Sequence, residues 1–313
     1  MDKQRVGNTR LMTKVCLIFV FNFRYDQNLE KLRRVYERAF SHIRSLVPFY
    51  DGTATDAIAI SESSYCFQGY FAQAFHQFYA PSFTHYAFVA DDLVLNPKLN
   101  EKNLISSLGL DTSTSFIKGI HPITDGHDWF HIVPSLRAFA ETPYIDSNNL
   151  LPSREEAGRL LARHGIVNTE LSKITAQKLL GHSAPRRWVD RLWASLGLLD
   201  RTVPYPCAFG YSDFIVVPAA YIRQFCRLCG IFAAMNLFAE VAVPTALAFA
   251  SERINTERDL DMKGVEVWDK QQVEAFGEEH GYEIHTLLSR FPKDRLYIHP
   301  VKLSKWHLTV VDQ

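Results

Sequence analysis

The 313-residue sequence lacks an excess of charge of either sign, since Lys and Arg together number 34 and Asp and Glu together also number 34. A chain without a net field has no general attraction for polyanions, so we predict no nucleic-acid partner. No apolar run reaches the roughly 20 residues that a membrane-spanning helix needs, and the polar start MDKQRVGNTR has no signal-peptide core. The sequence therefore predicts a cytoplasmic protein with no transmembrane segment, and it leaves peripheral membrane association open.

Cysteine is also scarce. The five cysteines, at positions 16, 66, 207, 226 and 229, are odd in number and lie in apolar stretches, which is typical of reduced thiols and excludes a disulfide framework. The pair CRLC at 226–229 has the spacing of a redox or zinc half-site. Because no second pair accompanies it and its surroundings have helical spacing, we expect these thiols to serve packing.

Strand-like and helix-like segments alternate along the chain. The apolar run Val15 to Phe21 is typical of a strand covered on both faces. Apolar residues at three- and four-residue spacing then predict a helix, and further strands are expected at SLVPFYDG, DAIAIS and HYAFVA. This pattern predicts a single α/β domain over residues 1–313, with a mainly parallel central sheet flanked by helices. Residues 151–200 carry many charges at helical spacing and are expected to form a helical insertion.

Two acids, Asp91 and Asp92, directly follow one predicted strand in the stretch HYAFVADDLVLNP. Adjacent carboxylates raise each other's pKa unless a cation or hydrogen-bond donors lie between them. Ligands of open α/β sheets bind at the carboxyl ends of strands. Because Mn²⁺ and Mg²⁺ accept oxygen ligands from carboxylates and phosphates together, the pair indicates a divalent-metal site for a phosphorylated ligand. The alternative is a solvated turn in which Asp91 is a cap.

The order of these segments resembles that of nucleotide-sugar-dependent glycosyltransferases of the GT-A fold. The likeness is carried by VADDLVLNP after a βαβ start, the later GYSD segment, the FAE helix and the late HPVK, and it covers most of the chain outside 150–200. It implies an enzyme of polysaccharide biosynthesis that moves a sugar from a nucleotide-diphosphate sugar, expected to be a UDP-sugar, to a glycan or lipid-linked acceptor. The sequence departs from the family's DxD motif, because Ala90 gives ADD.

The resemblance also implies roles for particular residues. Asp92 and His299 would be metal ligands for Mn²⁺ or Mg²⁺, Asp91 would touch ribose, sugar or metal, and Lys302 would meet a phosphate oxygen. Asp213 would contact the sugar and Glu240 would be the catalytic base. The nucleotide would lie among five residues after the first strands: Phe21, Asn22, Arg24, Tyr50 and Asp51.

Structural roles remain open for three of these side chains. Asp213 is also typical of a turn, Glu240 of the first turn of a helix, and His299 of a strand end where backbone groups satisfy the ring. Ala90 keeps open a third class of function, a sugar-nucleotide-binding protein that has lost its catalysis.

A different enzyme class is represented by the stretch HPITDGHDWFH. Five potential metal donors lie within eleven residues and indicate a metal-dependent hydrolase as the alternative function: His121, Asp125, His127, Asp128 and His131. The spacing matches no zinc signature, and Pro122 with Gly126 predicts a loop.

Overall fold

The computed structural model describes residues 14–126, 129–140, 145–180 and 200–309. Its main sheet has seven strands in the order β10-β6-β9-β4-β1-β2-β3. Their bounds are β1 (Val15–Val20), β2 (Ile43–Pro48), β3 (Ala57–Ile60), β4 (His85–Ala90), β6 (Thr114–Ile117), β9 (Phe214–Pro218) and β10 (Arg253–Asn255). Strand β9 runs antiparallel to both of its neighbours, and the other pairs are parallel. The predicted α/β architecture with a mainly parallel sheet is confirmed.

Strand β1 explains how one sheet separates two cores. Every residue of β1 is buried, and successive side chains point to opposite faces. Ile18 and Val20 pack into one hydrophobic cluster, whereas Leu17 and Phe19 pack into another. The continuous apolar run in the sequence is therefore the signature of a strand with helices on both sides.

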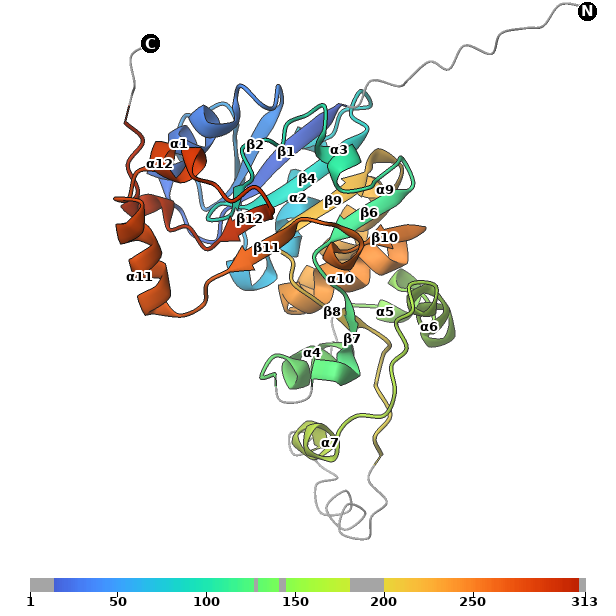
Figure 1. Cartoon of the computed structure of the whole chain (residues 1–313). Helices are drawn as coiled ribbons and strands as arrows, with labels where there is room; N and C mark the ends of the chain where they lie inside the picture. The colour runs from blue at the N-terminus through green and yellow to red at the C-terminus, as the bar shows by residue number, and fades with distance from the viewer. Residues whose placement is uncertain (1–13, 127–128, 141–144, 181–199, 310–313) are drawn as a thin grey trace, which may run out of the picture.

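Helices cover both faces (Figure 1). One cluster contains residues of α2 (Gln68–Phe78), α9 (Ala219–Ala234) and α10 (Ala239–Ala250). The other contains residues of α1 (Asp26–Tyr36), α3 (Leu104–Ser107) and α12 (Ile284–Ser289). Helix α11 (Lys270–Glu279) lies at one side of the molecule. The CRLC pair lies in α9, and all five cysteines are buried and unpaired with one another, as expected of packing residues.

A second, three-stranded sheet joins the end of the chain to the segment after β4. It consists of β11 (Lys263–Glu266), β12 (Arg295–His299) and β5 (Val94–Leu95) in the order β11-β12-β5. Strand β12 runs antiparallel to β5, with Ile298 opposite Val94. His299, the last residue of β12, is thereby carried close to the acidic pair after β4.

The described part of the connection between β7 (His121–Pro122) and β8 (Ala208–Phe209) carries several helices and extends away from the main sheet in Figure 1. It contains α4 (Ile132–Ala140), α5 (Ser147–Leu150), α6 (Arg154–Ala162) and α7 (Lys173–Leu180). Helices thus begin before residue 151, the expected start of the insertion. Ser153 caps α6 by accepting from the Glu156 amide at 3.2 Å. Part of the expected insertion, residues 181–199, lies outside the described residues.

Candidate active site at the carboxyl end of strand β4

Three distant segments meet where β4 ends. The Asp91 amide donates to the carbonyl of Val20 at 3.0 Å, which ties the acidic pair to the end of β1. The Ala90 amide donates to the carbonyl of Asp213 at 2.8 Å, so the residue before β9 lies at the same edge. The Val301 amide donates to the carbonyl of Asp92 at 2.6 Å. Backbone hydrogen bonds therefore fix the relative positions of segments that are far apart in sequence.

Asp92 is the centre of a buried polar cluster. Its Oδ1 lies 3.1 Å from Nε2 of His299, and its Oδ2 accepts from Nζ of Lys302 at 2.5 Å. Burial alone would raise the pKa of Asp92, but hydrogen bonds and charges from His299 and Lys302 outweigh it and lower that pKa. Burial would lower the pKa of His299, yet the hydrogen bond with Asp92 and the Asp213 charge raise it. The cluster favours an ionised carboxylate beside two cationic partners.

Asp213 and Glu240 provide two further carboxylates at this site. The Oδ2 of Asp213 is 3.9 Å from Nε2 of His299, and burial raises the pKa of Asp213 to about 6. Glu240 lies in the first turn of α10, and the Gly210 amide donates to its carbonyl at 2.9 Å. Burial, followed by the charges of Asp213 and Glu266, raises the pKa of Glu240 to about 7. A carboxylate that titrates near neutral pH is suited to proton transfer.

These residues line one open cavity of about 860 Å³. Its walls include Asp92, Asp213, Glu240, His299 and Lys302 together with Asn22. The other lining residues were not predicted from the sequence: Tyr25, Ser64, Tyr65, Phe67, Phe238, Ala239, Val267, Trp268, Lys270, Val273, Glu274, Pro300, Ser304 and Lys305. Trp268 is 66% exposed, with its ring centroid 5.5 Å from that of His299. An aromatic side chain that stays exposed at a cavity mouth is a usual feature of ligand sites, but nothing in its sequence neighbourhood distinguishes Trp268 from a core tryptophan.

Asp91 occupies a different environment from its neighbour. Its Oδ1 accepts from the Asn22 amide at 3.3 Å and its Oδ2 from Nδ2 of Asn28 at 3.4 Å. Burial and the charge of Asp92 raise the pKa of Asp91 to about 7. Asp91 is not among the residues that line the cavity and holds the loop after β1, and the ligand contact that the resemblance implied for it stays a prediction.

The expected nucleotide-base residues divide into three groups. Phe21 has no exposed surface and belongs to the core, which corrects the expectation that its side chain contacts a nucleotide. Asn22 lines the cavity. Arg24 lies between two carboxylates, with Nη2 2.9 Å from Asp26 and 2.5 Å from Asp51, and its guanidinium carbon lies 5.7 Å from the Tyr50 ring. Arg24, Tyr50 and Asp51 do not line the cavity and form their own surface cluster.

A divalent cation is compatible with the donor chemistry of this site. Carboxylate oxygen and imidazole nitrogen suit Mn²⁺, and Asp92 with His299 supplies one of each. Among the described residues, no group of three or more His, Cys, Asp or Glu is arranged to hold a metal. Mg²⁺ at phosphate sites is commonly held by one or two carboxylates, with substrate oxygens and waters completing the shell. Two protein ligands are therefore sufficient when a diphosphate is present.

The rival histidine cluster is only partly described. Residues 127 and 128 lie outside the described residues, and so do the two donors that they would supply. The His131 ring stacks on Phe238 at 3.6 Å between centroids, and burial lowers its pKa. His121 is the first residue of β7, and its ring centroid lies 5.5 Å from that of Phe209. The hydrolase alternative stays a prediction.

Within the described ranges, no helix has the length and apolar character that crossing a bilayer requires. Comparisons with protein-family models, with curated proteins and with solved structures found no match to this chain.

Proposed function

We propose that the protein is a glycosyltransferase that moves a sugar from a nucleotide-diphosphate sugar, expected to be a UDP-sugar, to an acceptor hydroxyl. One observation carries the proposal: His299 and Lys302, from a segment far along the chain, converge on Asp92 in the same cavity as the acids Asp213 and Glu240. A cavity of about 860 Å³ is large enough for a donor and part of an acceptor. The GT-A likeness of the sequence supports the same conclusion, as an analogy.

The leaving diphosphate needs positive charge. Lys302 is half-exposed and lies at the cavity, so its ammonium can leave one Asp92 oxygen and pair with a phosphate. Asp92 and His299 would hold Mn²⁺ or Mg²⁺, and the bound ion would neutralise charge that develops on the diphosphate. The pKa of His299 is raised by its hydrogen bond with Asp92 and the charge of Asp213, so its imidazole would have to be deprotonated in order to hold the ion.

The acceptor hydroxyl needs a base close to the anomeric carbon. Glu240 is suited to this role because, in the described part of the chain, its carboxylate has no hydrogen-bond partner and its pKa is about 7. Asp213 is more deeply enclosed and lies next to His299, which suits a contact with sugar hydroxyls. In this assignment Glu240 accepts the hydroxyl proton and Asp213 orients the donor sugar.

A thermal-shift titration tests the donor site. We expect UDP with Mn²⁺ to raise the Tm by more than UDP or Mn²⁺ alone, because ligand and metal share Asp92. The Asp92→Ala variant should lose the manganese-dependent part of the shift. Glu279→Gln, which changes an acid at the end of α11 outside the cavity lining, is the control and should behave as the parent.

Other outcomes would redirect the assignment. Equal stabilisation of the parent and Asp92→Ala by UDP and Mn²⁺ would contradict the metal site. Stabilisation by Zn²⁺ alone would favour the hydrolase, and no response to any nucleotide would favour a protein without transfer activity.

A further inference from the structure

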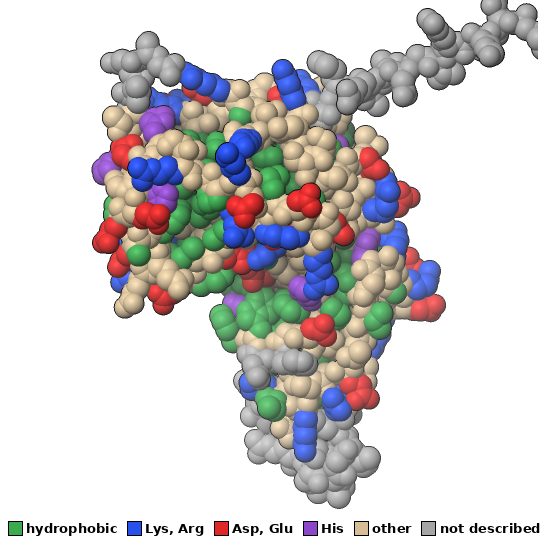
Figure 2. Space-filling model, in the orientation of Figure 1, with side chains coloured by type: hydrophobic (Ala, Val, Ile, Leu, Met, Phe, Trp, Pro, Cys, Tyr) green, Lys and Arg blue, Asp and Glu red, His purple; other side chains and the backbone are tan. Residues whose placement is uncertain are grey.

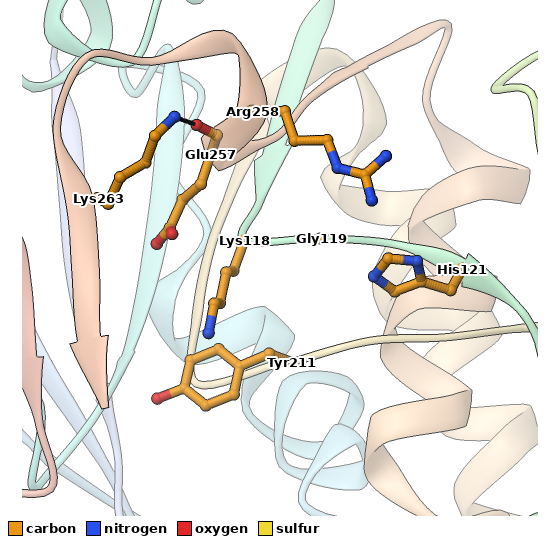
Figure 3. Close-up of a pocket in the computed structure, with 7 residues that line it drawn as sticks. All are labelled: Lys118, Gly119, His121, Tyr211, Glu257, Arg258 and Lys263. Atoms are coloured by element: carbon orange, nitrogen blue, oxygen red, sulfur yellow. Dashed lines mark hydrogen bonds between the residues drawn. The ribbon is translucent and has the colours of Figure 1, made fainter. Parts of the chain in front are cut away.

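A second cavity of about 370 Å³ is lined in part by Tyr211, whose ring lies near residues of the candidate active site. It is lined by Lys118, Gly119, His121, Tyr211, Glu257, Arg258 and Lys263 (Figure 3). The Tyr211 ring lines this second cavity, and its centroid is 5.7 Å from that of His299 and 6.3 Å from that of Trp268, two residues of the larger cavity. A ligand that occupied both regions would therefore pass Tyr211.

The walls of this second cavity come from segments that the fold brings together. Lys118 follows β6, His121 begins β7, Arg258 lies in the turn Glu257–Asp259, and Lys263 begins β11. Figure 3 shows these side chains around an open space, with the Lys118 ammonium 4.8 Å from the Tyr211 ring centroid. Lys and Arg side chains also gather near the middle of this face in Figure 2, above a hydrophobic area.

Positive charge predominates among the lining residues. Lys118 is paired with Glu266, and Lys263 donates to the carbonyls of Glu257 and Leu260. Glu257 supplies the carboxylate of the lining, and its Oε1 accepts from the Gly264 amide at 3.1 Å. Arg258 differs from the two lysines: in the described part of the chain its guanidinium has no hydrogen-bond or ion-pair partner. Its guanidinium is thus available to bind a ligand.

We propose that this cavity, the Lys118–Arg258–Lys263 pocket, is a second anion-binding site and takes a phosphate group. Arg258 can bind an oxyanion through two parallel N–H bonds, and the flanking ammonium groups add charge. Gly119 also lines the cavity, and a Cβ there would lie 3.3 Å from Nε2 of His121, so a larger residue would crowd the ring. The pocket does not include Lys302, so this site is distinct from the donor diphosphate site.

The phosphate is assigned to the acceptor, and this assignment rests on the proposed transfer function. Tyr211, which lines this pocket, lies close to His299 and Trp268 of the cavity that contains Glu240, as expected for an acceptor whose hydroxyl reaches that base while its anionic group is held near Tyr211. A phosphorylated glycan and a lipid phosphate share this chemistry.

Isothermal titration with inorganic phosphate tests the pocket itself. The titrations use Lys302→Gln protein, so that the donor site contributes little. We expect Arg258→Gln in that background to weaken phosphate binding roughly tenfold, the effect of losing one strong charge-assisted hydrogen-bonded pair. Arg290→Gln is the matched control, because Arg290 is also exposed and lies outside both cavities. Equal phosphate binding by Arg258→Gln and Arg290→Gln would overturn the proposal.

Crystals soaked in sodium tungstate locate the site directly. We expect tungsten anomalous density between Arg258 and Lys263 in the parent and in Lys302→Gln, and none there in Arg258→Gln. If tungsten density in the parent appeared only near Lys302, the proposal would be overturned and the donor-site assignment would be unaffected. Conversely, failure of the UDP and Mn²⁺ titration would remove the assignment to an acceptor and leave the anion site standing.

Titration with two organic phosphates then identifies the source of the phosphate. Glucose 6-phosphate and farnesyl phosphate are each titrated against Lys302→Gln and Arg258→Gln/Lys302→Gln. Tighter Arg258-dependent binding of farnesyl phosphate than of inorganic phosphate supports a lipid phosphate, and tighter binding of glucose 6-phosphate supports a phosphorylated glycan. If neither ligand depends on Arg258, the acceptor assignment is wrong.

Discussion

At the scale of single residues, the acids at the end of β4 have divided roles. Asp92 faces the cavity and is bonded to His299 and Lys302, whereas Asp91 is turned toward Asn22 and Asn28. Their pKa values move in opposite directions because Asp92 has cationic partners and Asp91 has neutral donors and a charged neighbour. Like-charge repulsion within the pair is thus relieved because Asp91 keeps its proton to a higher pH than Asp92 does.

Replacing Glu240 tests the catalytic base. Glu240→Gln removes the proton acceptor but preserves size, so we expect the rate of sugar transfer to fall by a factor on the order of 10²–10⁴ while UDP binding persists. The pH profile is the second readout: the parent rate should rise as pH increases through about 7, where Glu240 loses its proton, and the residual rate of the Glu240→Gln variant should not. Loss of UDP binding together with the rate would instead indicate a structural role.

The raised pKa values also predict how stability varies with pH. Asp91, Asp213 and Glu240 keep protons in the folded state that the unfolded chain has already lost, so the free energy of unfolding should fall between about pH 4 and about pH 7. The raised pKa of His299 acts in the same direction, because its contribution is lost as pH rises through the folded value. The lowered pKa of Asp92 contributes stability that is lost only in more acidic solution.

Asp91→Asn should therefore flatten this pH dependence and stabilise the protein at pH 8 by about 1 kcal/mol. An amide at position 91 carries no charge to bury, and the Asn28 side-chain oxygen, which has no hydrogen-bond partner among the described residues, can accept from it. Urea unfolding at pH 5 and pH 8 measures the effect. Asp261→Asn, which changes an exposed acid, is the control. If the free energy of unfolding of Asp91→Asn changed between pH 5 and pH 8 as much as that of the parent, the explanation would be refuted.

At the scale of secondary-structure elements, the site depends on contacts between the start and the end of the chain. The Lys31 ammonium, on α1, donates at 2.7 Å to the carbonyl of Leu303 and at 2.7 Å to that of Trp306. These carbonyls lie at the two ends of the 3₁₀ turn Leu303–Lys305, which directly follows Lys302. Helix α1 is thereby tied to the segment that delivers Lys302 to Asp92.

Lys31→Met should destabilise the protein by about 1.5–3 kcal/mol, because it leaves two carbonyls without a charged donor. We also expect weaker UDP binding, which Lys31→Arg should partly restore since it retains donors. Lys98→Met, at an exposed lysine, supplies the control for loss of charge. Denaturant unfolding together with UDP titration distinguishes this from a purely local effect: unchanged UDP affinity in a folded Lys31→Met protein would remove the positioning role.

The approach of two loops at Gly210 is a second element-level constraint. A Cβ at Gly210 would lie 2.2 Å from the carbonyl oxygen of Gly119, which is backbone and cannot turn aside. Gly210→Ala should therefore cost about 1–3 kcal/mol of stability and disturb the segment that carries Asp213. At Gly158, in the middle of α6, an added Cβ would meet no described atom within 4 Å beyond its own helix, so Gly158→Ala should instead stabilise the protein by about 0.5–1 kcal/mol. In thermal unfolding, the Tm of Gly210→Ala should fall below that of the parent and the Tm of Gly158→Ala should rise above it.

At the scale of the whole molecule, the main sheet connects two cores that share the same strands. Ile18 and Phe19 are neighbours on β1 but pack into different clusters. Loss of either core would therefore uncover one face of the strands on which the other core packs. We expect the sheet to unfold as one cooperative unit.

Substitutions on the two faces test that cooperativity. Phe71→Leu on one side and Phe116→Leu on the other each remove fully buried aromatic surface. Each should lower the free energy of unfolding by about 1–2 kcal/mol and shift the same calorimetric transition to lower temperature. Two resolved transitions that respond separately to the two variants would contradict a shared unit.

The sequence by itself determined the alternation of strands and helices, the burial of β1 on both faces and the place of the acidic pair at a strand end. These features are local, because the spacing of apolar residues and the ends of strands can be recognised within short runs of consecutive residues. It also indicated His299, Lys302, Asp213 and Glu240 as site residues, through a resemblance and not through spacing. Phe21 was misassigned because a residue just beyond a strand gives no local signal of whether it points inward.

Only the tertiary structure decided which side chains meet. The pairing of β12 with β5 brings His299 within 3.1 Å of Asp92, and no pattern in either segment specifies that contact. The same applies to the separate environments of Asp91 and Asp92, to Trp268 at the cavity mouth, and to the cations of the Lys118–Arg258–Lys263 pocket, which come from separate elements and loops. Long-range packing sets distance, burial and therefore pKa, and these quantities are properties of the fold and not of the adjacent sequence.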